Sequence, residues 1–202
     1  CNDWQAALVP MLLYHGIDGH FRNGQEKTLM TIHNLAHHGW APADKFYMTN
    51  LPGSCYTMQT LEFYGEINML KGGLVGATAI NAVSPTYAEE IKTPRFGCRL
   101  NGVLYHRQNV LHGILNGIDY TRWDPATDPY LPAHYSVDDL SGKAICKKDL
   151  QRAAGFKPDA KVPLLGMITR LVPQKGIDIL AGAIEEIVAT GAQLVTLGTG
   201  DS

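Results

Sequence analysis

The chain has 202 residues, and its 17 Lys and Arg against 19 Asp and Glu give a formal net charge of −2 with the eight His counted neutral. Without a basic excess to neutralise phosphates, the charge balance argues against nucleic-acid binding. Hydrophobic residues make up 45% of the chain, enough for a folded core, and no apolar stretch approaches the roughly 18 residues of a membrane-spanning helix. We therefore expect a soluble globular protein with no nucleic-acid or membrane partner.

The two ends read as the interior of a longer sequence. The chain opens at Cys1 without an initiator Met and stops in a turn-like run, residues 198–202, directly after a strand-like segment. We expect a piece of a longer protein, with any targeting signal outside it. The four cysteines are far apart, which excludes a zinc ribbon or a Cys-x-x-Cys redox motif and argues against a disulfide framework.

Strand-like and helix-like runs alternate along the chain, which predicts an α/β protein with a mainly parallel sheet. In the first half we expect a short helix over 4–14, a strand over 28–32 and a stretch over 56–76 that is helical in pieces and broken by Gly72-Gly73. Further strands are predicted over 79–83 and 110–115. Between them, Ser84 followed by Pro85 is typical of a helix start.

The composition changes at Asn116. Residues 116–132 are rich in Asp, Asn and Pro and carry little periodicity, which indicates a linker. A helix over 141–154 ended by Gly155, a strand over 163–168, a helix over 177–188 and a strand over 193–197 follow. We therefore divide the chain into domains 1–115 and 116–202.

Two cations lie between a predicted strand and a predicted helix. Arg170 and Lys175 then stand at the carboxyl end of a sheet beside a helix N-terminus, where α/β proteins bind anionic ligands. A bidentate guanidinium and a compact ammonium together suit a diphosphate. A pair of solvated surface cations is the alternative. Gly198 and Gly200 follow the next strand, where they allow either close approach of a ligand to the backbone or simply a tight turn.

A His and an Asn follow the strand over 28–32. His33 and Asn34 can hydrogen-bond a polyhydroxyl ligand. Together with His37 and His38, His33 also allows a zinc site, but no Glu or Cys completes the ligand set and Gly39 interrupts a helix there. We therefore predict no metal.

Seven short segments occur in the order found in bacterial glycogen synthases and plant starch synthases, and they span nearly the whole chain. They are Asn2-Asp3-Trp4-Gln5, Thr31-Ile32-His33-Asn34-Leu35-Ala36, Leu61-Glu62-Phe63-x-Gly65, Ala82-Val83-Ser84-Pro85-Thr86-Tyr87-Ala88, Gly113-Ile114-Leu115-Asn116-Gly117-Ile118-Asp119, Thr169-Arg170-Leu171-Val172-Pro173-Gln174-Lys175-Gly176 and Leu197-Gly198-Thr199-Gly200-Asp201. The sequence therefore resembles this family of retaining glycosyltransferases that use ADP-glucose.

The resemblance implies two Rossmann-like domains facing across a cleft, the GT-B fold, both incomplete in this chain. Residues 1–115 correspond to the latter part of the acceptor-side N-terminal domain, and 116–202 to the linker and the start of the nucleotide-sugar-binding domain. By the same resemblance, His33 and Asn116 are catalytic positions in the active site, and Asp3 and Asn34 join His33 on the substrate side.

The resemblance also assigns the later segments. Arg170 and Lys175 stabilise the departing diphosphate, and Gly198 and Gly200 lie on the nucleotide side. Such cations stabilise the charge that develops as the glycosidic bond to ADP breaks, so neither a metal nor another cofactor is required. The family's Lys-x-Gly-Gly loop, which contacts the nucleotide diphosphate, does not occur at its expected upstream place. Lys71-Gly72-Gly73 imitates it, but it follows the Leu61 motif, in a segment that the family uses for another purpose, so we do not assign it to the nucleotide loop.

The function implied is transfer of glucose from ADP-glucose to the nonreducing end of an α-1,4-glucan with retention, in the cytoplasm of a bacterium or the plastid of a plant. Three alternatives stay open: a related enzyme that uses a UDP-sugar, a phosphorylase-like reaction, and a non-catalytic glucan-binding remnant. The acidic motif of the later C-terminal domain is also absent, so we expect the 202 residues alone to be inactive. The oligomeric state is not indicated.

Overall fold

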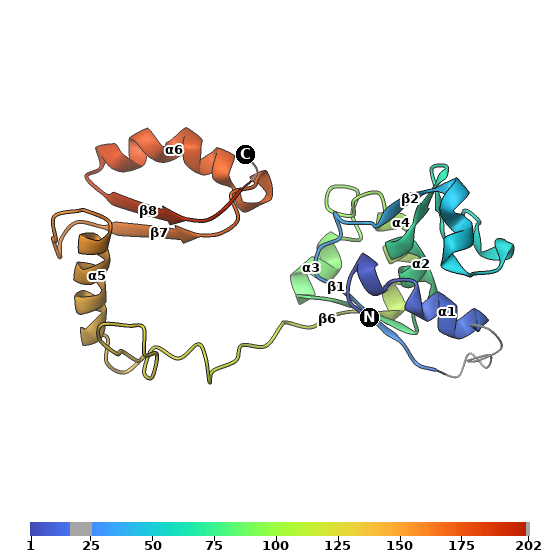
Figure 1. Cartoon of the computed structure of the whole chain (residues 1–202), viewed down its shortest axis with the longest axis horizontal. Helices are drawn as coiled ribbons and strands as arrows, with labels where there is room; N and C mark the ends of the chain where they lie inside the picture. The colour runs from blue at the N-terminus through green and yellow to red at the C-terminus, as the bar shows by residue number, and fades with distance from the viewer. Residues whose placement is uncertain (17–25, 201–202) are drawn as a thin grey trace. The chain divides into compact units, whose positions relative to one another are not determined.

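The computed structural model describes residues 1–16 and 26–200. The chain folds into two compact units, Cys1–Gly117 and Ile118–Ser202 (Figure 1). The division lies two residues after the predicted boundary. The roles predicted for the two parts stay predictions.

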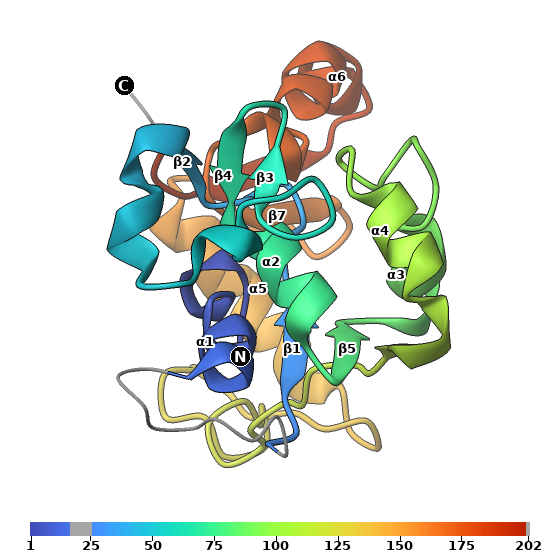
Figure 2. The ribbon, with the colours of Figure 1, turned by 90° about the vertical axis from the view of Figure 1, so that its right-hand side faces the viewer.

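Unit 1 is built on a parallel three-stranded sheet in the order β1-β5-β6, whose strands are β1 (Leu29–Ile32), β5 (Ala79–Ala82) and β6 (Leu111–Gly113). Its first two strands lie side by side in Figure 2. Its helices are α1 (Val9–His15), α2 (Met69–Gly76), α3 (Pro85–Glu90) and α4 (Asn101–His106), with 3-10 turns η1 (Trp4–Ala6), η2 (Ala43–Thr49), η3 (Gly53–Cys55) and η4 (Gln108–Val110). The sheet is as predicted, but the helix predicted over 4–14 divides into η1 and α1.

A small antiparallel sheet corrects the prediction for residues 56–76. Its order is β2-β4-β3, with strands β2 (Trp40–Pro42), β4 (Glu66–Asn68) and β3 (Glu62–Phe63). Tyr64 and Gly65 join β3 to β4 with φ of 53° and 83°, the two positive angles of a type I′ hairpin turn. The helical prediction is therefore wrong for the first part of this stretch and right only for α2.

Glycine does not break α2, which also contradicts the prediction. A Cβ on Gly72 would lie 2.4 Å from Leu61 Cδ2, and one on Gly73 would lie 2.8 Å from Ala7 Cβ. The missing side chains let the helix pack directly against η1 and the hairpin. Both residues are buried, so close packing outweighs their weak helix propensity.

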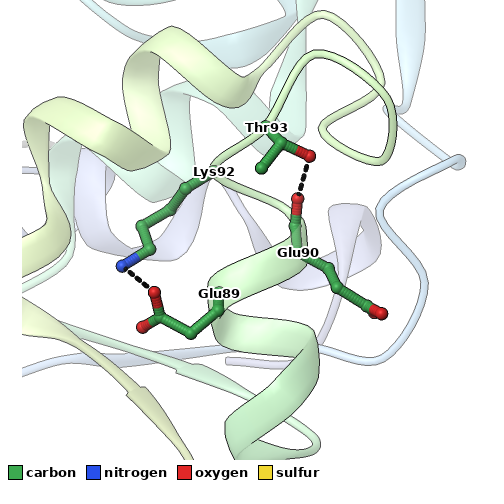
Figure 3. A network of polar contacts seen from close by, with 4 residues as sticks. All are labelled: Glu89, Glu90, Lys92 and Thr93. Atoms are coloured by element: carbon green, nitrogen blue, oxygen red, sulfur yellow. Dashed lines mark hydrogen bonds and ion pairs between the residues drawn. The ribbon is translucent and has the colours of Figure 1, made fainter.

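Helix α3 begins as the sequence predicts. Ser84 Oγ accepts a hydrogen bond from Tyr87 N at 2.9 Å, and Pro85 occupies the first helical position. At the other end, Lys92 Nζ lies 2.7 Å from Glu89 Oε2 and Thr93 Oγ1 donates to the Glu90 carbonyl (Figure 3). The helix is thereby fixed at both ends over the edge of the main sheet.

The core of unit 1 is fully enclosed. Side chains of the main sheet and of helix α2 have relative exposures of 0–2%, among them Met30, Ile32, Leu70, Leu74 and Ile80. A second cluster, centred on Leu61 and Ile67, packs beneath the hairpin. Burying each such side chain contributes about 1.5–3 kcal/mol, so this unit has a complete apolar interior.

Unit 2 contains one parallel strand pair, β7 (Leu164–Ile168) and β8 (Gln193–Leu197), with α5 (Ser141–Ala153), the 3-10 turn η5 (Pro173–Lys175) and α6 (Ile177–Ala189). These elements match the predicted ones within a residue or two. Residues 114–140 contain no helix or strand, as the linker prediction requires. Within residues 1–16 and 26–200, no helix has the length and apolar character needed to cross a membrane.

Candidate functional site

Three predicted site segments of unit 1 meet the same edge of the main sheet. Because β1, β5 and β6 are parallel, the residues that follow each of them, His33, Ser84 and Ile114, emerge at one edge. Gly113 ends β6 so close to the start of α3 that a Cβ there would lie 2.3 Å from Pro85 Cα. Carboxyl ends of parallel strands are where open α/β sheets bind ligands. Asn116 is exposed on the segment that continues from β6.

Asp3 organises the turn after β1. Its Oδ1 accepts hydrogen bonds from the backbone N–H of His33 at 2.7 Å and of Asn34 at 3.2 Å. Asn2 Oδ1 lies 2.9 Å from His33 Nε2. Because an amide oxygen only accepts, Nε2 carries the proton in this pair and Nδ1 is left as an acceptor for a hydroxyl group.

The three predicted substrate residues form part of one small site. Asp3 and Asn34 line a pocket of about 220 Å³, whose other walls are Trp4, Gln5 and His37. His33 is exposed on the adjoining turn. Sequence reasoning assigned no role to Gln5 and considered His37 only as a metal ligand. The one available signal was its position four residues after His33.

The geometry around His38 does not support the alternative of a zinc site formed by His33, His37 and His38. This residue is 5% exposed, its Nδ1 accepts from Asn68 Nδ2 at 2.8 Å, and its ring stacks on Trp40 with the centroids 5.0 Å apart. Burial lowers the pKa of His38, because desolvation penalises the imidazolium form. His38 is therefore a core residue. Among the described residues, no three His, Cys, Asp or Glu side chains gather in a metal-binding group.

Tyr87 links α3 to the turn that carries the site. Its hydroxyl accepts a hydrogen bond from Leu35 N at 3.1 Å. Burial raises the pKa of Tyr87, so the phenol stays neutral and the link persists through the physiological pH range. The position of His33 and Asn34 is thus set by η1 on one side and by α3 on the other.

In unit 2, the predicted cations lie on the connection from β7 to α6. Both Arg170 and Lys175 are exposed, and Lys175 ends the turn η5 just before the left-handed residue Gly176. The connection is held against the end of β8, because Leu171 N donates to the Thr199 carbonyl at 2.8 Å. Both cations therefore stand at the carboxyl end of the strand pair and are open to solvent.

Gly198 and Gly200, the two glycines predicted on the nucleotide side, pack so closely against the loop after β7 that a side chain at either position would clash with its backbone. A Cβ on Gly198 would lie 1.9 Å from the Thr169 carbonyl oxygen, and one on Gly200 would lie 2.7 Å from the Leu171 carbonyl oxygen. Their role toward a nucleotide stays a prediction. Asp201 of the same segment lies outside the described residues.

Lys71, which we did not assign to a nucleotide loop, is a buried residue that bonds to neighbouring backbone. It lies in α2, is 3% exposed, and its Nζ donates to the carbonyls of Met58 at 2.5 Å and Glu62 at 2.6 Å. The ammonium also lies 5.0 Å from the centroid of the Phe63 ring. These contacts hold the hairpin to the helix.

A model of the starch synthase catalytic domain matches residues 1–106, more than half of the chain. The chain belongs to the starch synthase catalytic domain family. Glycogen synthase 1 of Methylococcus capsulatus is 46% identical over 201 residues, which cover 100% of this chain and 40% of that protein. A glycogen synthase of an Anaeromyxobacter species is 49% identical over 201 residues, 98% of this chain and 42% of that protein.

A solved structure agrees with these relatives. The catalytic domain of starch synthase IV from Arabidopsis thaliana, bound to ADP and acarbose, matches the whole chain with a TM-score of 0.89 and 35% identity, and the match covers 42% of that structure's chain. The predicted α/β class and GT-B family of folds are confirmed. The chain spans about two fifths of the length of the curated glycogen synthases it matches. The site residues themselves stay predictions.

Proposed function

We propose that this chain is part of a glycogen synthase that transfers glucose from ADP-glucose to the nonreducing end of an α-1,4-glucan with retention of configuration. The observation that carries the proposal is the match along the whole chain to glycogen synthases and to a starch synthase structure with ADP and acarbose bound. The geometry adds a sugar-sized polar pocket in unit 1 and exposed cations at the strand ends of unit 2.

The unit 1 residues suit the sugar side of the reaction. Asp3 and Asn34 offer carboxylate and amide groups along the pocket, and His33 offers an acceptor nitrogen beside it. A polar site of this kind orients glucose hydroxyls, and holding the sugar in a reactive geometry lowers the barrier to displacement at C1. Asn116, on the exposed segment that continues from β6, is the second active-site residue proposed here.

The unit 2 residues suit the leaving group. The bond between glucose C1 and the β-phosphate oxygen breaks, the acceptor 4-hydroxyl oxygen bonds to C1, and the hydroxyl proton leaves with the phosphate. Negative charge therefore grows on the diphosphate in the transition state. Arg170 and Lys175 stabilise that charge, with Gly198 and Gly200 on the nucleotide side, so the proposed reaction requires no metal or other cofactor.

A bacterial setting fits the relatives best. The curated relatives include bacterial glycogen synthases at 44–49% identity, whereas the Arabidopsis structure is 35% identical. The proposal therefore places the reaction in a bacterial cytoplasm and not in a plastid. ADP-glucose is proposed as the donor over UDP-glucose, because the matching plant structure carries ADP.

The test is a transplant. The corresponding segment of Methylococcus capsulatus glycogen synthase 1 is replaced by residues 1–202, and transfer of labelled glucose to glycogen is measured with ADP-glucose and with UDP-glucose. We expect activity with ADP-glucose, and Lys175→Gln should lower turnover by about 10²–10³-fold, the usual cost of removing one transition-state donor.

Lys161→Gln is the matched control, since Lys161 is an exposed cation in unit 2 away from the loop after β7. Its turnover should equal that of the unmodified chimera. Full turnover by the Lys175→Gln variant would refute the role given to Lys175, and preference for UDP-glucose would refute the donor. The 202-residue chain alone should show no transfer.

A further inference from the structure

Unit 1 carries a second recess that the proposed reaction does not use. It has a volume of about 490 Å³ and is lined by Met58, Gln59, Lys71, Val75, Gly102, Val103, His106 and Arg107. It shares no residue with the pocket formed by Asp3, Trp4, Gln5, Asn34 and His37. Its size falls within the range of small-molecule sites.

The lining combines apolar walls with positive charge. Met58, Val75 and Val103 supply the apolar surface, while Lys71 and Arg107 supply two cations. None of the eight lining residues is acidic. The described part of the chain contains no ion pair to either cation, because its two ion pairs involve Lys45 and Lys92.

Both cations are held in place by the fold. Lys71 is 3% exposed and is anchored by the carbonyls of Met58 and Glu62, so two of its three ammonium protons are used. Burial lowers its pKa, and the charge of Glu62 offsets this only in part. A positive charge in this position is therefore stabilised by any anion that enters the recess.

Arg107 has spare hydrogen-bonding capacity. Its Nη2 donates to the Ala77 carbonyl at the end of α2. Its Nε is buried and has no hydrogen-bond partner among the described residues. Buried polar groups are satisfied in the great majority of cases, so an unpaired N–H on a fixed guanidinium marks a place where an acceptor is missing.

We propose that this recess binds a small organic anion, with a phosphate or carboxylate on Arg107 and Lys71 and an apolar body against Met58, Val75 and Val103. Guanidinium and oxyanion form the strong, charge-assisted class of hydrogen bond, and the guanidinium of Arg107 has donors beyond the one that it gives to Ala77. The apolar wall selects a ligand with a carbon body over a free inorganic anion.

The probe is phenyl phosphate, which combines an apolar ring with a phosphate. Phenol and inorganic phosphate serve as comparison ligands, because each carries only one of these two groups. Binding to the 202-residue chain is measured by calorimetry and by nuclear magnetic resonance shifts of unit 1. We expect saturable binding of phenyl phosphate, weaker binding of inorganic phosphate and of phenol, and shifts centred on α2 and α4.

Two variants separate binding from folding. Arg107→Gln should weaken phenyl phosphate binding at least about tenfold, but it also removes the contact to Ala77. Gly102→Leu avoids that problem, because a Cβ at Gly102 meets nothing within 4 Å and the longer side chain would fill the recess. It should abolish binding without lowering the melting temperature.

The matched controls are Arg95→Gln, an exposed arginine outside the recess, and Gly182→Leu, a helical glycine of unit 2 with equally open surroundings. Neither should change binding. Absence of saturable phenyl phosphate binding, or binding that survives Gly102→Leu in a folded protein, would overturn the proposal. So would binding no tighter than that of phenol, since the cations would then contribute nothing.

Discussion

The two units differ in how completely they bury their apolar side chains. In unit 1, Ile80 on β5 has no exposed surface and lies in a closed cluster. In unit 2, Ile168 at the end of β7 is 82% exposed and Ile179 on α6 is 75% exposed, and no residue of α6 is buried. A buried core therefore stabilises the α/β elements of unit 1. In unit 2, the same kinds of element are stabilised mainly by hydrogen bonds within the helices and between the two strands.

This difference governs how firmly each set of site residues is placed. His33 and Asn34 are fixed by Asp3, by Tyr87 and by the buried strand β1 beneath them. Arg170 and Lys175 stand on an exposed connection over a strand pair with little core. Unit 1 therefore holds the residues proposed for the sugar side in fixed positions, whereas within these 202 residues the cations proposed for the diphosphate stand on a strand pair with little core of its own.

The largest expected effect tests the two cores directly. Ile80→Ala should destabilise unit 1 by about 2–5 kcal/mol, because it leaves a cavity in a closed core. Ile179→Ala, the same change at an exposed site, should alter the stability of unit 2 by no more than about 0.5 kcal/mol. Hydrogen exchange read by mass spectrometry resolves the two units. Equal losses of protection would contradict the distinction.

A smaller effect is expected at the glycines of unit 2. Gly198→Ala forces its Cβ into the Thr169 carbonyl and should destabilise unit 2 by about 1–3 kcal/mol. Gly182→Ala lies in open space on α6 and should stabilise it by about 0.5–1 kcal/mol. Urea unfolding followed by the helical circular dichroism signal measures both changes. A stabilising Gly198→Ala would show that the strand-end packing is not as described.

The smallest effect is a pH dependence confined to unit 1. Burial lowers the pKa of His38, so below its ordinary value of about 6.5 the unfolded chain binds more protons than the folded one. Stability of unit 1 should fall as the pH drops below that value and should be level above it. His38→Gln should flatten the profile measured by thermal unfolding between pH 5 and pH 8, with unit 2 unchanged. The same slope in the variant would assign it to another group.

The sequence predicted the elements that have strong local signals. Ser84 and Pro85 start α3, and the apolar runs give all the strands of both parallel sheets. The hairpin was missed because strands of two and three residues have no visible periodicity and depend on pairing with β2. Gly72-Gly73 looked like a helix break because its close packing against Leu61 and Ala7 is a long-range contact.

The candidate site shows the same division. Asp3, His33 and Asn34 were found through short segments of sequence, and the structure brings them together. Gln5 and His37 complete the pocket only because η1 lies against the turn after β1, a contact between residues some thirty positions apart. The recess at Arg107 had no sequence signal, since its lining comes from three separate segments.

Three chimeras test most directly whether both units serve one glucosyl transfer. Residues 1–117, residues 118–202 or the whole chain replace the matching parts of Methylococcus capsulatus glycogen synthase 1, and transfer from ADP-glucose to glycogen is measured after folding is verified by circular dichroism. All three should be active, with Lys175→Gln silencing the two that contain unit 2. A folded whole-chain chimera without transfer activity would contradict the proposed function.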